Sequence, residues 1–259
     1  MTEYQTIKFE QAGAITRITL NRPDAANGMD DTMTRELADA ARRCDTEATK
    51  VVVITGSGRF FCAGGDLKSF ASAPSRSRYI KGIADDLHRA ISTFARMDAV
   101  LITSVNGVAA GAGFSFAVTG DLVLAAESAS FTMAYTRAGL SPDGSASYYL
   151  PRLIGIRKTQ ELMLTNRTLS AQDASQWGLV TEVVPDEELA ARTDKLADQI
   201  AATSRQSNGA VKALLLTTFK NGIEEQMEFE GRLIAERADS ADGREGVDAF
   251  LGKRKAEFA

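Results

Sequence analysis

Two glycine-rich segments constrain the fold of this chain more than any other feature of its sequence. Residues 60–66 read Phe-Phe-Cys-Ala-Gly-Gly-Asp, and residues 106–113 read Asn-Gly-Val-Ala-Ala-Gly-Ala-Gly. Each comes after a short β-prone run, 51–55 or 101–105, and each leads into a segment that can start a helix. Small residues let the backbone approach a ligand closely and leave N–H groups free to point at it. Two such turns can grip one oxygen atom, and they stabilise it best when it gains negative charge.

The spacing of apolar residues predicts strands alternating with helices in the first half of the chain. Apolar and polar residues alternate over 15–20, as in a half-buried strand, and apolar residues recur at near-helical spacing over 29–44. The same patterns predict further strands at 51–55, 101–105 and 121–125, and helices at 79–97 and 112–119. Such alternation is typical of the α/β class.

Helices dominate the sequence from about residue 157. Ser170 can cap a helix that ends near Gly178, and residues 180–184 are typical of a short strand before Pro185. Four more helices are predicted, at 186–203, 207–220, 223–238 and 244–253. The α/β part is therefore followed by a helical C-terminal part.

Composition and charge argue against several classes of protein. The 259 residues suit one large domain or a domain with an appendage, and the net charge of -4 does not suggest a nucleic-acid surface. Cys44 and Cys62 are too few for a disulfide framework or a zinc site, and no residue cluster has metal-ligand spacing. Residues 100–120 are uncharged, but their glycines and polar residues favour a buried strand, turn and helix over a membrane span. With no targeting pattern at the start, we expect a cytoplasmic protein without membrane or nucleic-acid partners.

Several common catalytic and binding motifs are missing. No Gly-x-Gly-x-x-Gly opens a helix ahead of an acidic residue, and Gly56-Ser57-Gly58-Arg59 does not continue into a P-loop. The one histidine, His88, comes without a Gly-x-Ser-x-Gly elbow. A dinucleotide-binding fold, a P-loop enzyme and a Ser-His-Asp hydrolase are therefore disfavoured.

Motifs along the whole chain point to one family. They are Asn21-Arg22-Pro23 with Asn27, Phe61-Cys62-Ala63-Gly64-Gly65-Asp66-Leu67, Asn106-Gly107-Val108-Ala109-Ala110-Gly111-Ala112-Gly113, Gly120-Asp121, Ala171-Gln172-Asp173-Ala174, Trp177-Gly178-Leu179-Val180, Arg244-Glu245-Gly246, Phe250 and Lys253-Arg254. Together they resemble the crotonase superfamily, also called the enoyl-CoA hydratase/isomerase family. The resemblance implies a ββα spiral over residues 1–200 and a C-terminal helical region, 201–259, that completes a homotrimer or a dimer of trimers. It also implies an acyl-CoA thioester substrate, with coenzyme A as part of that substrate and neither a metal nor a covalently bound cofactor.

The resemblance also assigns residues to the ligand. The N–H groups of Gly65 and Ala112 are expected on the thioester oxygen, although many family members have glycine where this chain has Ala112. Coenzyme A is expected along two stretches of the chain and against two residues of a neighbouring subunit. The residues of the two stretches are Ala25, Ala26, Ala63, Asp66, Leu67 and Lys68, and those of the neighbouring subunit are Phe250 and Lys253.

The two glutamates that hydratases of this family use are absent. Their positions hold Ser115 and Tyr135, and neither is a carboxylate base at neutral pH. Asp143 lies on a Pro-Asp-Gly turn, where family isomerases of the 1,2-epoxyphenylacetyl-CoA and Δ3,Δ2-enoyl-CoA types carry one acid/base, although such a turn is also ordinary loop chemistry. We therefore expect an isomerase in which Asp143 moves a proton while the glycine turns hold the enolate oxygen.

Two other functions remain as alternatives. His88, Tyr135 and Asp143 together resemble 4-chlorobenzoyl-CoA dehalogenase, in which the Asp attacks an aromatic ring and the His helps water to release the product. A histidine on a helix is, however, more often a surface or packing residue. The other alternative is a non-catalytic acyl-CoA-binding scaffold, suggested by the loss of both glutamates. Whether Asp143 points into the thioester pocket or into solvent separates this scaffold from the enzymes.

Overall fold

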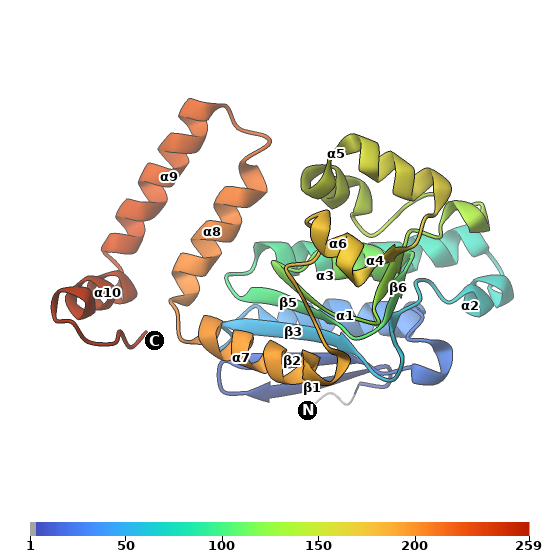
Figure 1. Cartoon of the computed structure of the whole chain (residues 1–259), viewed down its shortest axis with the longest axis horizontal. Helices are drawn as coiled ribbons and strands as arrows, with labels where there is room; N and C mark the ends of the chain where they lie inside the picture. The colour runs from blue at the N-terminus through green and yellow to red at the C-terminus, as the bar shows by residue number, and fades with distance from the viewer. Residues whose placement is uncertain (1–3, 259) are drawn as a thin grey trace.

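A six-stranded sheet forms the centre of the protein in the computed structural model, which describes residues 4–258 (Figure 1). In spatial order its strands are β1 (Ile7–Ala12), β2 (Ile15–Leu20), β3 (Val51–Gly56), β5 (Val100–Val105), β7 (Leu122–Ala126) and β10 (Glu182–Val184). β1 runs antiparallel to β2, and the other neighbouring strands are parallel, with Val53 opposite Ile102 in the β3–β5 register. The sheet confirms the predicted α/β class.

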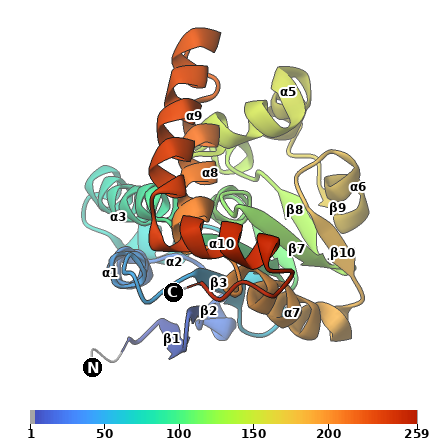
Figure 2. The same cartoon turned by 90° about the vertical axis from the view of Figure 1, so that its left-hand side faces the viewer.

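Helices cover both faces of this sheet, which explains why its central strands are almost wholly apolar. Every residue of β5 is buried, as are the first four of β3. In Figure 2, α1 (Asp31–Cys44) and α3 (Arg76–Arg96) lie on one side of the sheet, where they pack against each other. Helix α7 (Leu189–Ala201) packs on the other side.

A second, four-stranded sheet positions the two glycine-rich segments. Its strands, in spatial order, are β4 (Phe60–Cys62), β6 (Val108–Ala110), β8 (Ser130–Thr132) and β9 (Leu169–Ser170). The sequence analysis did not predict it, because strands of two or three residues are too short to show a periodic pattern. Each glycine turn therefore follows a strand of this small sheet instead of following 51–55 or 101–105 directly. As predicted, each turn leads into a short helix, α2 (Leu67–Ser72) or α4 (Ala112–Ala117).

The remaining elements agree with the predicted order, although several of their boundaries differ from the predicted ones by a few residues. Ser170 caps α6 (Ala171–Gln176) as expected, its hydroxyl accepting a hydrogen bond from the Asp173 N–H at 3.0 Å. The helical part begins before residue 157, with α5 (Ala146–Thr165), and the helix predicted at 186–203 begins as a 3-10 turn, η3 (Asp186–Glu188). Two more 3-10 turns, η1 (Pro23–Ala25) and η2 (Thr136–Ala138), flank the site described below. Within the described residues, no helix is long and apolar enough to cross a membrane.

The C-terminal helices are attached to the sheet through a buried lysine. They are α8 (Arg205–Thr217), α9 (Ile223–Ala238) and α10 (Ala241–Leu251), and in Figure 1 α9 and α10 stand away from the sheet. Lys212 of α8 is 7% exposed, and its ammonium donates to the carbonyls of Phe94 and Ala99 and pairs with Asp121 at 2.8 Å. Three acceptors satisfy the three donors of this buried charge. The division between residues 1–200 and 201–259 stays a prediction.

Candidate active site

A single asparagine holds the loop that leads into the first glycine turn (residues 60–66). The side-chain amide of Asn27 donates to the carbonyls of Ser57 at 2.9 Å and Phe60 at 2.8 Å, and its oxygen accepts the Arg22 N–H at 2.9 Å. Asn27 is fully buried and has a left-handed backbone, with φ of 51°. Buried carbonyls need such partners, so Asn27 determines the path of the chain into β4.

An ion pair holds the other end of the same turn. The Arg22 guanidinium pairs with Asp66 at 2.9 Å and with Asp30 at 3.1 Å. Asp66 also caps α2, accepting the N–H groups of Lys68 at 3.1 Å and Ser69 at 3.3 Å. Burial alone would raise the pKa of Asp66, but the hydrogen bonds from Arg22 and the Ser69 N–H outweigh it, so its pKa lies below the ordinary value. The Asp66 carboxylate, which we expected near coenzyme A, is therefore already engaged in holding the turn.

The two glycine turns touch each other. A Cβ added to Gly64 would lie 3.3 Å from the Ala112 nitrogen, and one added to Gly113 would lie 2.1 Å from the Cys62 carbonyl oxygen. Only glycine permits this approach of the two backbones. The turns consequently bring the two N–H groups predicted to hold an oxygen into one place.

Both predicted N–H groups are free to donate a hydrogen bond to a ligand. Met29 bridges the chain on either side of Gly65, donating to the Gly64 carbonyl at 2.7 Å and accepting the Asp66 N–H at 2.9 Å. In a parallel bridge of this kind the Gly65 N–H points away from Met29. Ala112 is the first residue of α4, where an N–H has no partner inside the helix. Neither N–H has a protein acceptor among residues 4–258.

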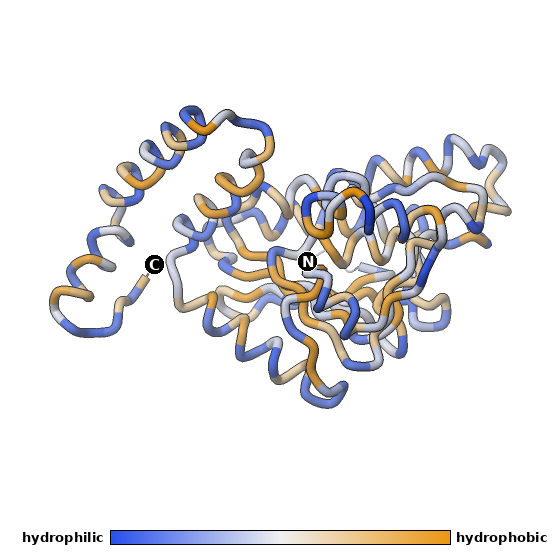
Figure 3. Tube along the Cα trace, turned by 45° about the horizontal axis from the view of Figure 1, so that its top comes forward, coloured by the Kyte–Doolittle hydropathy of each residue, from blue (hydrophilic) through white to orange (hydrophobic). Residues whose placement is uncertain are grey.

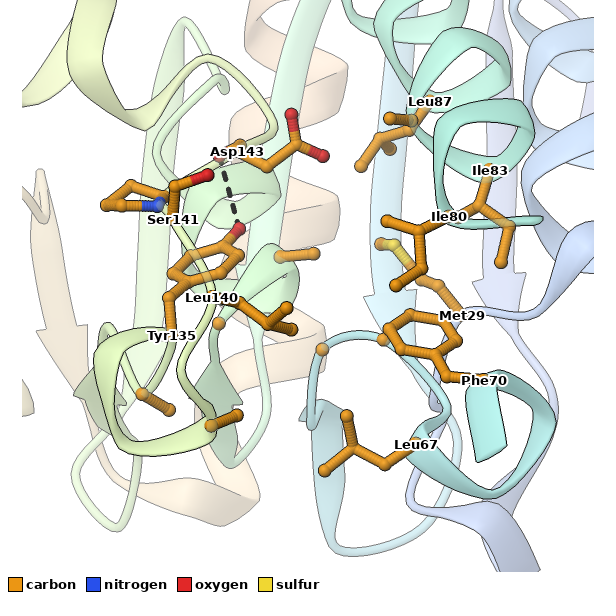
Figure 4. A pocket seen from close by; sticks show the side chains of 18 of the residues that line it. Met29, Leu67, Phe70, Ile80, Ile83, Leu87, Tyr135, Leu140, Ser141 and Asp143 are labelled. Carbon is orange, nitrogen blue, oxygen red and sulfur yellow. Dashed lines mark hydrogen bonds between the residues drawn. The ribbon is translucent and has the colours of Figure 1, made fainter. Parts of the chain in front are cut away.

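A cavity of about 460 Å³ opens at these N–H groups, and Gly65 and Ala112 both line it. Its apolar wall comes from Met29 and from helices α2 and α3 (Figure 4). On α3 the lining residues Ile80, Ile83 and Leu87 recur at helical spacing, so one face of the helix meets the cavity. The size and the apolar lining suit a small organic group.

Asp143 lies on the opposite wall, in the loop of residues 139–145 (the Asp143 loop). Figure 4 shows its carboxylate pointing across the cavity toward Leu87. One carboxylate oxygen is 2.7 Å from Nε2 of His88, which follows Leu87 on α3. The His88 side chain is 48% exposed and that of Asp143 35%; Asp143 lines the cavity, whereas His88 does not. The structure thus brings His88 and Asp143 together, as the dehalogenase-like alternative requires.

Two hydroxyl groups support the Asp143 loop from below. The Tyr135 hydroxyl donates to the Asp143 backbone carbonyl at 3.1 Å, drawn as a dashed line in Figure 4. The hydroxyl of Ser115, a fully buried residue of α4, lies 2.9 Å from that of Tyr135. Burial raises the pKa of Tyr135 above its ordinary value, so its hydroxyl stays protonated. The two positions where hydratases carry glutamates therefore hold a neutral pair.

The residues predicted to contact coenzyme A fall into two groups. Ala63 and Leu67 line the cavity, and the turn at Ala25 and Ala26 lies beside them, since the Ala26 carbonyl accepts the Ala63 N–H at 3.0 Å. Lys68 is exposed in the first turn of α2, directly after the first glycine turn. Phe250 is 83% exposed at the end of α10, Lys253 is exposed just beyond it, and neither lines the cavity.

The apolar wall and the residues that support the site were not predicted from the sequence. The wall could have been predicted, because Ile80, Ile83 and Leu87 share one face of the predicted helix 79–97. The roles of Arg22 and Asn27 had no local signal beyond their place in a motif. Their partners lie up to 44 residues away along the chain.

The structure also bears on metals and thiols. In the part of the chain that the structure describes, no group of three or more His, Cys, Asp or Glu side chains is placed to hold a metal ion. Cys44 and Cys62 are buried and unpaired, and burial raises the pKa of Cys62 to about 12. A thiol with so high a pKa is a poor nucleophile at neutral pH.

Comparison with known proteins identifies the family. A family model described as enoyl-CoA hydratase/isomerase matches residues 10–259. The 1,2-epoxyphenylacetyl-CoA isomerase of Escherichia coli is 37% identical, covering 96% of this chain and 95% of its own, and a probable enoyl-CoA hydratase of Rhodobacter capsulatus is 35% identical over 98% of both chains. The crystal structure of an enoyl-CoA hydratase from Polaromonas sp. JS666 has a TM-score of 0.90 at 31% identity and covers 98% of this chain and 99% of that one. The protein has the crotonase fold and belongs to the enoyl-CoA hydratase/isomerase family.

Proposed function

We propose that this protein is an isomerase that moves the double bond of an enoyl-CoA thioester, with Asp143 as the acid/base. The observation that carries the proposal is the position of one carboxylate. Asp143 points into the cavity that holds the Gly65 and Ala112 N–H groups, whereas the two hydratase glutamate positions are occupied by hydroxyls. One carboxylate suffices for a proton shift, because no water molecule has to be activated.

The proposed reaction moves one proton between two carbon atoms. The thioester oxygen of a β,γ-enoyl-CoA accepts hydrogen bonds from Gly65 and Ala112, which makes the α-proton acidic. Asp143 takes that proton, and the electron pair of the C–H bond spreads into a dienolate whose oxygen the two N–H groups stabilise. The protonated Asp143 then gives the proton to the γ-carbon, and the double bond of the product is conjugated with the thioester carbonyl.

The coenzyme A part and the assembly complete the proposal. We place the coenzyme along Ala63 and Leu67 and past the turn at Ala26, with Phe250 and Lys253 supplied by a neighbouring subunit of a homotrimer or a dimer of trimers. Large apolar side chains that are exposed by more than half in the C-terminal region support an assembly; they include Leu215, Phe219, Ile223, Met227, Ile234 and Phe250. Figure 3 shows hydrophobic residues recurring along this region of the chain. Light scattering on the purified protein tests it, and a monomer would contradict it.

The decisive experiment on the chemistry replaces the carboxylate by its amide. In Asp143→Asn we expect turnover of β,γ-enoyl-CoA esters, followed by the absorbance of the conjugated product, to fall by about 10² to 10⁴-fold. Calorimetric binding of a saturated acyl-CoA should stay unchanged, because the N–H groups remain in place. Asp194→Asn is the matched control, since Asp194 is an exposed carboxylate of α7 that pairs with Arg17 of β2. Normal turnover by Asp143→Asn would end the isomerase proposal.

A second candidate function is favoured by the 2.7 Å contact between His88 and Asp143. In a dehalogenase-like route an Asp143 oxygen bonds to the halogen-bearing carbon of an aryl-CoA, and halide leaves. Water, deprotonated by His88, then attacks the resulting ester and releases a hydroxyaryl-CoA. Mass spectrometry after mixing with 4-chlorobenzoyl-CoA distinguishes the routes. An aryl adduct on Asp143 that accumulates in His88→Gln supports this route, and an unmodified protein supports the isomerase.

A non-catalytic binding role is the weakest of the three readings. The orientation of Asp143 separates a scaffold from an enzyme, and this side chain lines the cavity instead of pointing away from it. A scaffold also has no need of two unpaired N–H groups beside a carboxylate. Failure to find turnover or isotope exchange on any acyl-CoA ester, with binding intact, would favour the scaffold.

A further inference from the structure

Building on the proposed isomerase function, we propose that Ser115 and Tyr135 are positioning residues for Asp143. Their hydroxyls form a hydrogen-bonded chain from the second glycine turn (residues 106–113) to the Asp143 backbone. The chain sets the position of the carboxylate relative to the Ala112 N–H, and so relative to the substrate carbon whose proton it takes.

Two hydroxyl protons serve the three contacts of this chain. The Asp143 carbonyl can only accept, and the Tyr135 hydroxyl lies 3.1 Å from it. The Gly111 carbonyl can also only accept, and Ser115 Oγ lies 3.2 Å from it. Either hydroxyl can be the donor in the 2.9 Å contact between Ser115 and Tyr135, so each hydroxyl links one carbonyl to the other hydroxyl. Neighbouring hydrogen bonds in such a chain polarise one another.

Tyr135 holds the Asp143 loop at both ends. Its backbone carbonyl accepts the Leu140 N–H at 3.0 Å, and its hydroxyl reaches the Asp143 carbonyl three residues further on. Between these contacts the loop has no regular structure, and directly after Asp143 it turns through positive φ angles at Gly144 (62°) and Ser145 (67°). An exposed loop of this kind has many accessible conformations, so the two contacts from Tyr135 select one of them.

Ser115 connects the loop to the oxyanion-binding backbone. It lies in α4, the helix that begins with Ala112, and its N–H donates to the Gly111 carbonyl at 3.0 Å. The backbone of the Asp143 loop packs against Ser115, since a Cβ added to Gly144 would lie 3.0 Å from the Ser115 Cβ. The helix that presents one oxyanion donor thus also supports the carboxylate, which couples the two parts of the proposed site.

The test compares hydroxyl deletions with matched controls. Tyr135→Phe and Ser115→Ala each remove one hydroxyl, whereas Tyr149→Phe and Ser104→Ala remove the same groups from half-buried or buried positions that do not line the cavity. Displacing a catalytic group by about 1 Å can cost about 100-fold in rate. We therefore expect kcat on a β,γ-enoyl-CoA to fall by about tenfold to 100-fold in Tyr135→Phe, with KM almost unchanged and both controls near wild type.

A double variant and a pH profile separate positioning from other roles. Because Ser115 acts through Tyr135, we expect Ser115→Ala with Tyr135→Phe to be no slower than Tyr135→Phe alone. The pH–rate profile should keep its shape at a lower plateau. Loss of one limb of that profile in Tyr135→Phe would make Tyr135 a proton donor and overturn the proposal, as would fully additive losses or an unchanged kcat.

Failure of this inference can be told apart from failure of the isomerase proposal. An active Asp143→Asn variant defeats the function itself, whereas an inactive Asp143→Asn beside a fully active Tyr135→Phe defeats only the positioning role. If Tyr135→Phe does not fold, Ser115→Ala carries the same test. It removes one oxygen from the start of the chain and should lower kcat in the same direction.

Discussion

The two sides of the proposed active site are built in different ways. The glycine turns supply only backbone N–H groups, and buried side chains such as Asn27 hold them from outside the cavity. The Asp143 loop supplies a side chain, is exposed over residues 139–141, and is held by the Ser115–Tyr135 chain. The proposed oxyanion donors thus belong to the packed turns, whereas the proposed acid/base is carried on a surface loop.

This difference explains how one fold can support several reactions. A backbone donor does not depend on its own side chain, so Ala112 can replace a glycine without loss of the N–H. A carboxylate on a loop can be moved, replaced or paired with a neighbour such as His88 while the core stays intact. We therefore expect substitutions at the turns to lower stability and substitutions at the loop to lower activity alone.

Gly113→Ala should have the largest effect on stability. The new Cβ would lie 2.1 Å from the Cys62 carbonyl oxygen, and backbone cannot move aside as a side chain can. We expect the free energy of unfolding to fall by about 3 kcal/mol or more and turnover to vanish. Urea denaturation measures the first effect. A variant of wild-type stability would show that the turns are not packed against each other.

Asn27→Ala should have the second largest effect on stability and lower the free energy of unfolding by about 2 to 3 kcal/mol. It removes the amide donor of the partly buried Ser57 and Phe60 carbonyls and of the buried Phe61 carbonyl. Asn21→Ala, a nearby partly buried asparagine, serves as the control and should change the free energy of unfolding by far less. Equal effects of the two variants would show that Asn27 does not support the first glycine turn.

Gly65→Ala should cost only about 1 kcal/mol, because its new Cβ meets the far end of a flexible side chain. That Cβ would lie 2.4 Å from Cζ of Phe70, whose ring can rotate into the cavity. We expect KM for bulky acyl groups to rise more than kcat falls. Adding Phe70→Leu should restore KM, and no recovery in the double variant would mean that the backbone itself had shifted.

Asp143→Asn should have the smallest effect on stability, within about 0.5 kcal/mol, even though it stops turnover. Its side chain contacts only the half-exposed His88 among the hydrogen-bond partners in residues 4–258. Thermal unfolding of the variant beside the wild type measures this. A large loss of stability would place Asp143 in the structural core and erase the contrast between the two sides.

The sequence predicted the main elements well where the pattern was long. Helix α9 has the predicted bounds of 223 and 238, and β2 has the predicted bounds of 15 and 20. The small sheet was missed because its strands are shorter than any periodic signal. The predicted start of the helical part, near residue 157, is later than the observed start of α5 at Ala146. The reason is that Pro151 and Gly155 weaken the helical pattern of the first turns.

For the proposed site, the sequence alone indicated which turns need glycine, and its family resemblance singled out Asp143 as the candidate carboxylate. These are local properties, because steric freedom and ionisable groups belong to individual residues. Only the tertiary structure decided that His88 meets Asp143 across 55 residues, and that Ser115 and Tyr135 join beneath it. Such contacts arise where separate strands and helices bring distant loops together, and the packing of the whole core sets that geometry.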